Sequence, residues 1–100
     1  MEPKLTAEEI LRQLRADKTF LNHKFGVIDI GLFGSFAKGL SGLESDIDLI
    51  VELKEPKFEW LAGLQVYLEG KFNRKIELIR KGSHINESFA SRIKKETLYA

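Results

Sequence analysis

The stretch "LFGSFAKGLSGLESDIDLIVEL", residues 32–53, decides the fold because two apolar runs flank a segment rich in glycine and serine. The first run completes "VIDIGLF", whose β-branched residues and bounding glycines predict a strand over 27–33. The second run, "DIDLIVEL", predicts a strand over 46–53 that is too apolar on both faces to lie at a sheet edge. Two neighbouring strands joined by a small, adaptable loop therefore form the centre of the predicted fold.

A helix is predicted before the first strand. Thr6 and Glu9 form a capping-box pattern, which places the start of this helix at Ala7. Its apolar periodicity fades toward Gly26, a suitable stop signal immediately ahead of the strand. The chain thus enters its central strands from a helix.

The second half of the chain alternates again between helix and strand. Apolar residues at helical spacing predict a helix over 57–72, and "KIELI", residues 75–79, predicts a short third strand. Ile85, Phe89 and Ile93 mark a closing amphipathic helix. The sequence predicts an α/β (α+β) protein with a small mixed sheet of about three strands packed with helices in the order α-β-β-α-β-α, as one domain over residues 1–100.

The composition is that of an ordinary globular domain and sets limits on partners. The net charge of +1 implies no global attraction to nucleic acid or to an acidic membrane. The chain contains no cysteine, and its N-terminal residues show no apolar segment of signal-peptide length. We therefore expect a cytoplasmic protein without membrane association.

Two of the chain's four aspartates, Asp46 and Asp48, stand one residue apart at the start of the second predicted strand. Side chains alternate along a strand, so both carboxylates are expected on one face, where a hard cation such as Mg²⁺ would offset their mutual repulsion. Gly34 and Ser35 end the preceding strand, where backbone N–H groups and the serine hydroxyl can hold a phosphate. Carboxylates that can bind a cation and groups that can donate hydrogen bonds to phosphate are thus expected on neighbouring strands. This combination indicates a binding site for a polyphosphate.

The motifs "FGSFAKG" and "SDIDLIV" resemble the signature of the minimal nucleotidyltransferases of the DNA polymerase β superfamily, and the similarity of element order extends over nearly the whole chain. The resemblance implies the nucleotidyltransferase fold and a site with two Mg²⁺ ions, or Mn²⁺. It implies that Asp46, Asp48 and Glu77 are catalytic metal ligands, with Glu77 standing where the family usually has aspartate.

The same resemblance implies that the residues around the Gly-Ser motif bind the nucleotide. Gly34 and Ser35 would hold the β- and γ-phosphates of ATP, and Lys38 stands where the family often places a basic residue that could contact the triphosphate. Phe36 departs from the family pattern, in which arginine is common at this position.

The implied function is transfer of AMP from ATP to a hydroxyl, expected to be a tyrosine, of a helical HEPN-type partner in a two-component toxin–antitoxin system, with this chain as the antitoxin. Two alternatives stay open. The departures at Glu77 and Phe36 favour a catalytically weak module that binds nucleotide and partner. Nucleotidyl transfer to a small molecule is the other.

An aromatic pair around a small residue, formed by Trp60, Gly63 and Tyr67, lies on one side of the predicted helix over 57–72, away from its main apolar stripe. Such a group indicates an interface with a partner protein or with another copy of the chain. The alternative is that the aromatic side chains cover the protein's own core.

Overall fold

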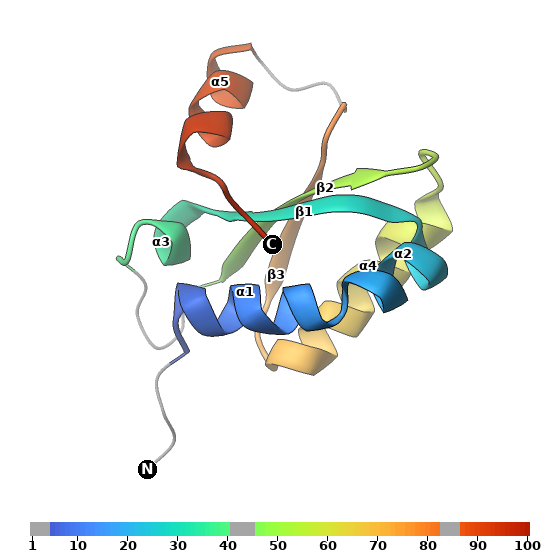
Figure 1. Cartoon of the computed structure of the whole chain (residues 1–100). Helices are drawn as coiled ribbons and strands as arrows, with labels where there is room; N and C mark the ends of the chain where they lie inside the picture. The colour runs from blue at the N-terminus through green and yellow to red at the C-terminus, as the bar shows by residue number, and fades with distance from the viewer. Residues whose placement is uncertain (1–4, 41–45, 83–86) are drawn as a thin grey trace.

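The computed structural model describes residues 5–40, 46–82 and 87–100, which form one mixed sheet with helices against it (Figure 1). The helices and strands follow the chain in the order α1 Ala7–Ala16, α2 Lys18–Phe25, β1 Val27–Phe33, α3 Gly34–Ala37, β2 Ile47–Leu53, α4 Phe58–Phe72, β3 Ile76–Arg80, α5 Glu87–Glu96 and β4 Leu98–Tyr99. The predicted fold class, a small mixed sheet packed with helices, is confirmed. Within the described residues, no helix has both the length and the apolar character needed to cross a membrane.

The sheet has the strand order β3-β2-β1-β4. Strand β1 pairs antiparallel with β2 and with β4, whereas β2 and β3 are parallel. A parallel pair needs a long crossover, and α4 provides it between β2 and β3. The predicted strand over 27–33 is confirmed to the residue, while β2 begins at Ile47 and leaves Asp46 just outside it.

Several features of the fold differ from the prediction, and one of them is the short helix α3 between β1 and β2, which the predicted element order lacks. Strand β4 was not predicted, because its two residues are too few to show an alternating pattern. The first helical region divides at Asp17 into α1 and α2, and α2 ends at Gly26 in the left-handed conformation. The closing helix begins at Glu87, and Ile85 lies outside the described residues.

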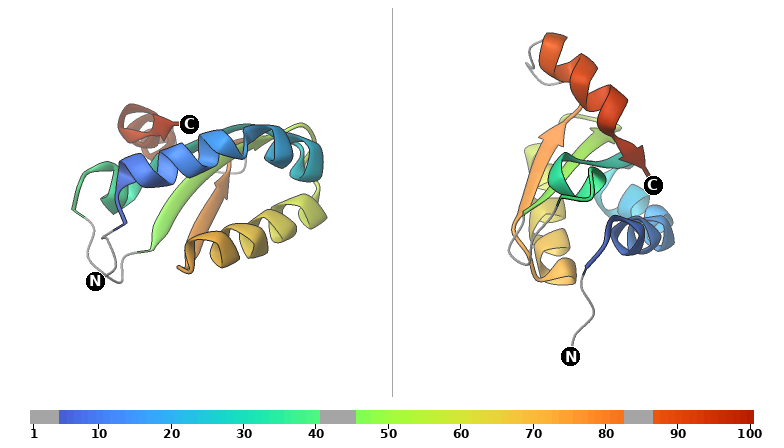
Figure 2. Two further views of the ribbon diagram at one scale, coloured as in Figure 1. Left: turned by 60° about the horizontal axis from the view of Figure 1, so that its bottom comes forward. Right: turned by 90° about the vertical axis from the view of Figure 1, so that its left-hand side faces the viewer.

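The two faces of the sheet are covered unequally (Figure 2). Helices α1, α2 and α4 pack on one face and enclose the main core, to which β2 contributes the fully buried Ile47, Leu49 and Val51. Helix α5 packs on the opposite face, where Ile93 joins Phe33 and Ile50 in a smaller cluster. Alternate residues of β2 therefore face different layers.

Helix α4 is held against α2 by the three residues that suggested a partner surface. The Trp60 ring lies on Gly26, where an added Cβ would be 2.2 Å from Cζ3, and Phe25 lies on Gly63, where an added Cβ would be 2.8 Å from Cε1. Tyr67 and Trp60 pack against the main core. These contacts lie within the chain and favour the alternative that the aromatic residues cover its own core, whereas the partner-surface interpretation stays a prediction.

Asp17, which stands between α1 and α2, is linked to α4 by a hydrogen bond that should stabilise the fold. Tyr67 Oη donates to Asp17 Oδ2 at 2.6 Å, and Lys71 Nζ lies 2.9 Å from the same oxygen. The hydrogen bond from Tyr67, with a further contribution from Lys71, lowers the pKa of Asp17, and the same bond raises the pKa of Tyr67 to about 12. An acid with a lowered pKa stabilises the fold above its unfolded pKa, about 4 for Asp, and this stabilisation is lost as the pH falls through the folded value.

We expect Tyr67→Phe to lower the free energy of unfolding by about 1 kcal/mol at neutral pH, because Asp17 then keeps only its Lys71 partner. The difference from wild type should shrink as the pH falls below about 4, where Asp17 becomes protonated in the unfolded chain. Urea unfolding across this pH range measures the effect. Tyr99→Phe, at a partly exposed tyrosine of β4, is the control and should change stability little. Equal stability of Tyr67→Phe and wild type at neutral pH would contradict the prediction.

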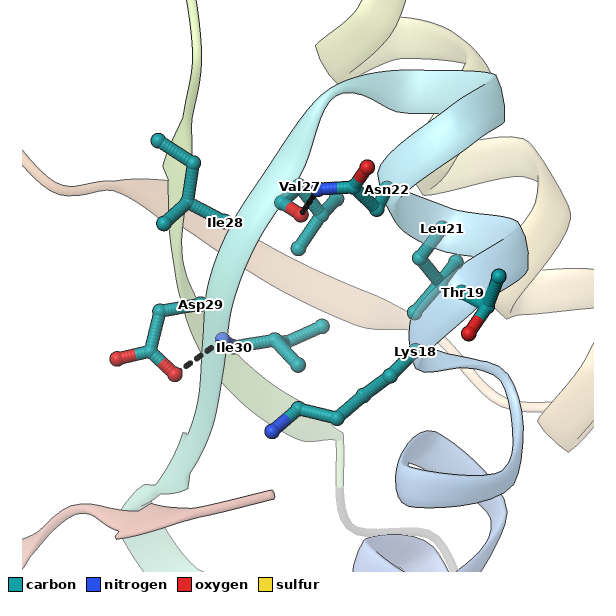
Figure 3. A pocket seen from close by; sticks show the side chains of 8 residues that line it. All are labelled: Lys18, Thr19, Leu21, Asn22, Val27, Ile28, Asp29 and Ile30. Atoms are coloured by element: carbon teal, nitrogen blue, oxygen red, sulfur yellow. Dashed lines mark hydrogen bonds between the residues drawn. The ribbon is translucent and has the colours of Figure 1, made fainter.

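The first half of β1 extends beyond β4 and borders a cavity of about 260 Å³ beside α2 (Figure 3). Side chains satisfy several backbone groups along this edge. Asn22 Nδ2 donates to the Val27 carbonyl oxygen at 3.0 Å, and the Ile30 N–H donates to Asp29 Oδ1 at 3.0 Å. The edge is thus protected by the chain itself, as exposed sheet edges commonly are.

Candidate functional site

The pairing of the strands brings the separate parts of the sequence motif together at Asp48. On one side, Asp48 is the register partner of Phe33, the residue that precedes Gly34. On the other side, it is the partner of Glu77 in the parallel pair of β2 and β3. Asp48 therefore lies between the glycine-serine motif and the predicted third carboxylate.

Strand alternation presents Asp48 on the face away from the main core. Its neighbours Ile47 and Leu49 are fully buried in that core, whereas Asp48 shares its face with Ile50, which packs toward α5. Asp48 itself is partly buried, and Asp46 stands immediately before the strand. The apolar residues of β2 thus anchor the strand that carries the carboxylate.

Burial and two neighbouring carboxylates disfavour the charged form of Asp48. Burial raises its pKa most, the hydrogen bond and charge of Glu77 add to the effect, and the charge of Asp46 contributes further, so that the pKa of Asp48 is about 6. The three carboxylates are therefore close enough to interact. An arrangement of like charges of this kind is stabilised by a cation.

The donor set suits a hard divalent cation, because carboxylate oxygens are the ligands that Mg²⁺ prefers. Over residues 5–40, 46–82 and 87–100, however, no three His, Cys, Asp or Glu side chains are already grouped closely enough to hold one metal ion. The carboxylates fit the ion in chemical type and in position, and their side chains would have to converge further to share it.

Gly34 lies directly against the Asp48 carboxylate. Its φ is 74°, in the left-handed region, and a Cβ at this position would be 2.0 Å from Asp48 Oδ2. Ser35 follows in α3, a single helical turn that ends at Ala37. The close approach of Gly34 and Asp48 brings the Gly-Ser motif and the Asp-x-Asp motif together in one site.

Lys38, the basic residue at the end of this turn, is paired with α5. Its Nζ lies 3.4 Å from Glu96 Oε2, and both side chains are partly exposed. Sequence reasoning missed Glu96, because no local pattern links it to Lys38, which lies far from it along the chain. The exposure of the pair leaves Lys38 able to exchange this partner for an anionic ligand.

Phe36 and Arg74 form a second contact that the sequence did not predict. The Phe36 ring is buried in the main core, and the Arg74 guanidinium lies over it, 5.3 Å from the ring centroid. Arg74 comes from the turn between α4 and β3, and only the fold brings it to α3. The Arg74 guanidinium therefore places a positive charge beside α3, although Phe36 of this helical turn is itself uncharged.

Comparison with known proteins agrees with this geometry. The model of the family described as "Nucleotidyltransferase domain" matches residues 14–99. Protein adenylyltransferase MntA of Thermococcus cleftensis is 35% identical over 96 residues, which cover 95% of this chain and 96% of that protein.

Two solved structures show the same fold. A toxin–antitoxin structure with AMP-PNP superposes with a TM-score of 0.68 at 18% identity, covering 84% of this chain and 69% of that chain. A structure of the tri-AMPylated HEPN toxin of Shewanella oneidensis in complex with an MNT antitoxin gives a TM-score of 0.59 at 18% identity, covering 88% of this chain and 70% of that chain.

Proposed function

The chain belongs to the nucleotidyltransferase domain family, and on this premise we propose that it transfers AMP from ATP to a tyrosine hydroxyl of a HEPN-type partner and so acts as an antitoxin. The observation that carries the proposal is the position of Asp48 between Gly34 and Glu77. The relative from Thermococcus cleftensis, a protein adenylyltransferase, supports the choice of AMP and of a protein acceptor.

In the proposed reaction, the tyrosine oxygen forms a bond to the α-phosphorus of ATP. The bond from that phosphorus to the bridging oxygen breaks, pyrophosphate leaves with the electron pair, and the hydroxyl proton passes to water. Two Mg²⁺ ions, or Mn²⁺, held by Asp46, Asp48 and Glu77 would neutralise the charge that develops on the phosphate oxygens.

The remaining groups of the site bind the leaving pyrophosphate. Gly34 offers a backbone without a side chain, and the Ser35 hydroxyl can donate to the β- and γ-phosphates. Lys38, at the end of α3, and Arg74, over the Phe36 ring of the same turn, could both supply positive charge. The protein thus mainly positions the triphosphate relative to the acceptor hydroxyl.

The test is incubation of the chain with ATP, Mg²⁺ or Mn²⁺ and a purified HEPN-type partner, followed by mass spectrometry of both intact proteins. We expect the partner to gain the mass of one or more AMP groups. Glu77→Gln should lower the rate by about 10- to 100-fold, because a neutral amide is a weaker metal ligand. Glu52→Gln is the matched control, since Glu52 lies farther along β2 and pairs with Lys81 on the surface.

A binding module without catalysis is the second candidate, favoured by the absence of a ready-made three-ligand metal group in the described residues and by the uncharged Phe36. Formation of a complex with the partner, without transfer of AMP under either metal ion, would support this candidate and refute the proposed reaction. Transfer of AMP to a small hydroxyl compound instead of the partner would refute the choice of a protein acceptor, but it would leave the proposed AMP transfer intact.

A further inference from the structure

Helix α5 lies on the sheet face opposite α1, α2 and α4, which is the face that carries Asp48 (Figure 2). Its buried residue Ile93 packs against Phe33 and Ile50. Phe33 immediately precedes Gly34 at the end of β1. Ile50 lies two residues beyond Asp48, on the same face of β2. The second half of α5 is therefore fixed next to the groups that are proposed to bind ATP.

Glu96, the last residue of α5, is held by the chain on both sides of it. Before it, Ile93 is buried in the smaller cluster, and the Ile93 carbonyl oxygen accepts a hydrogen bond from the Thr97 N–H at 2.9 Å. After it, Leu98 of β4 pairs with Leu32 of β1. Because the backbone is fixed at both points, the Glu96 carboxylate stays within reach of its partner at a high effective concentration.

That partner is Lys38, which is also fixed through its backbone. Its N–H donates to the Gly34 carbonyl oxygen at 3.1 Å, and Phe36 of the same turn is buried in the main core. Lys38 Nζ lies 3.4 Å from Glu96 Oε2, and among the residues that the structure describes it has no second ion-pair partner. The ammonium group at the end of the Gly-Ser turn is thus already paired with a carboxylate of the chain itself.

We propose that Glu96 competes with the β- and γ-phosphates of ATP for Lys38 and thereby lowers the affinity of the site for the nucleotide. This inference rests on the proposed function, in which Lys38 contacts the triphosphate. Carboxylate and phosphate oxygens accept the same charge-assisted hydrogen bonds from an ammonium group. A bound triphosphate must therefore displace Glu96 from Lys38, or lie beside an acidic side chain that repels it. Either way, nucleotide binding is weakened.

The exposure of the pair sets the size of this effect. The Lys38 side chain is 47% exposed and the Glu96 side chain is 33% exposed, so both can turn away without any movement of α5. An ion pair of this kind changes an equilibrium by about two- to fivefold. Glu96 therefore weakens nucleotide binding without blocking it, because a triphosphate carries several negative charges and is the stronger partner for Lys38.

Isothermal titration calorimetry of the full chain with AMP-PNP and Mg²⁺, without a protein partner, tests the competition. Glu96→Gln should lower the dissociation constant about two- to fivefold, because Lys38 is then available to the phosphates. Lys38→Met should raise the dissociation constant, and adding Glu96→Gln to Lys38→Met should change it little. Glu52→Gln is the matched control, because Glu52 forms a similar exposed pair with Lys81, at 3.5 Å, near the other end of β2. It should leave the affinity nearly unchanged.

The outcomes separate this inference from the proposed function, once circular dichroism has confirmed that each variant is folded. If Glu96→Gln bound AMP-PNP no more tightly than wild type while Lys38→Met bound it more weakly, the competition would be refuted and the nucleotide site would stand. Equal tightening by Glu96→Gln in the presence and absence of Lys38 would also refute the competition, since overall charge would then be the cause. If neither wild type nor any variant bound AMP-PNP, the nucleotide site and the competition would both be refuted.

Discussion

Asp48→Asn is expected to lower the rate of AMP transfer by about 100- to 1,000-fold, since loss of a metal ligand costs several kcal/mol of transition-state stabilisation. The same substitution should leave the protein at least as stable as wild type when no divalent cation is present. Asp48 is partly buried beside the carboxylates of Glu77 and Asp46, and a neutral amide removes their repulsion. Function and stability should therefore change in opposite directions.

Transfer is measured by mass spectrometry of the partner, and stability by urea unfolding in the presence of a chelator. Asp29→Asn is the control, because Asp29 lies on β1 beside the cavity next to α2 and accepts a local hydrogen bond from the Ile30 N–H. It should leave the transfer rate within a few-fold of wild type. If the Asp48→Asn variant transferred AMP at the wild-type rate, Asp48 would not be a ligand in the proposed metal site. A large loss of stability would show that its charge supports the fold.

Gly34→Ala should reduce transfer by about 100-fold while costing about as much stability as Gly39→Ala. The two glycines have nearly the same backbone, with φ of 74° and 73°, so alanine should strain each by about 1–2 kcal/mol. They differ in surroundings. An added Cβ at Gly34 would lie 2.0 Å from Asp48 Oδ2, whereas at Gly39 it would meet nothing within 4 Å.

The two shortest contacts at Gly34 are with Oδ2 and Cγ of Asp48, so rotation of the carboxylate relieves most of the clash, and the contact with Asp48 Cβ at 3.1 Å requires only a small shift of the chain. That rotation would remove the carboxylate from the proposed metal site and bring a methyl group to the place proposed for the phosphates. Comparing the two variants separates this effect from backbone strain: transfer assays should distinguish them, and urea unfolding should not. If both variants transferred AMP equally well, the proposed juxtaposition of Gly34 and Asp48 would have no functional role.

Part of the site could be predicted because its signals are local. The alternation of Ile47, Asp48 and Leu49 follows from strand geometry alone, and the structure confirms that the two apolar residues are buried. The ends of β1 could be read from the glycines on either side. Contacts between residues of this chain that are distant in sequence could not be predicted in this way, and Glu96, which pairs with Lys38, was missed.

The helix α4 illustrates the limit most clearly. Its sequence predicts a helix over 57–72, but not which apolar side faces the core, because that choice depends on α2 and the sheet. Trp60 and Tyr67 turned out to face the chain itself, while Phe58 and Val66 are left exposed. The sequence alone therefore did not show which apolar residues of α4 are the most exposed.

By itself, the sequence determined the central strand β1, the anchoring of β2 and the presence of a Gly-Ser motif and an Asp-x-Asp motif, since each of these is a pattern within a few residues. Only the tertiary structure decided that Gly34 touches Asp48, that Glu77 lies beside it, and that Phe58 and Val66 of α4 are exposed. The physical reason is that strand register and helix orientation are set by packing between elements far apart along the chain.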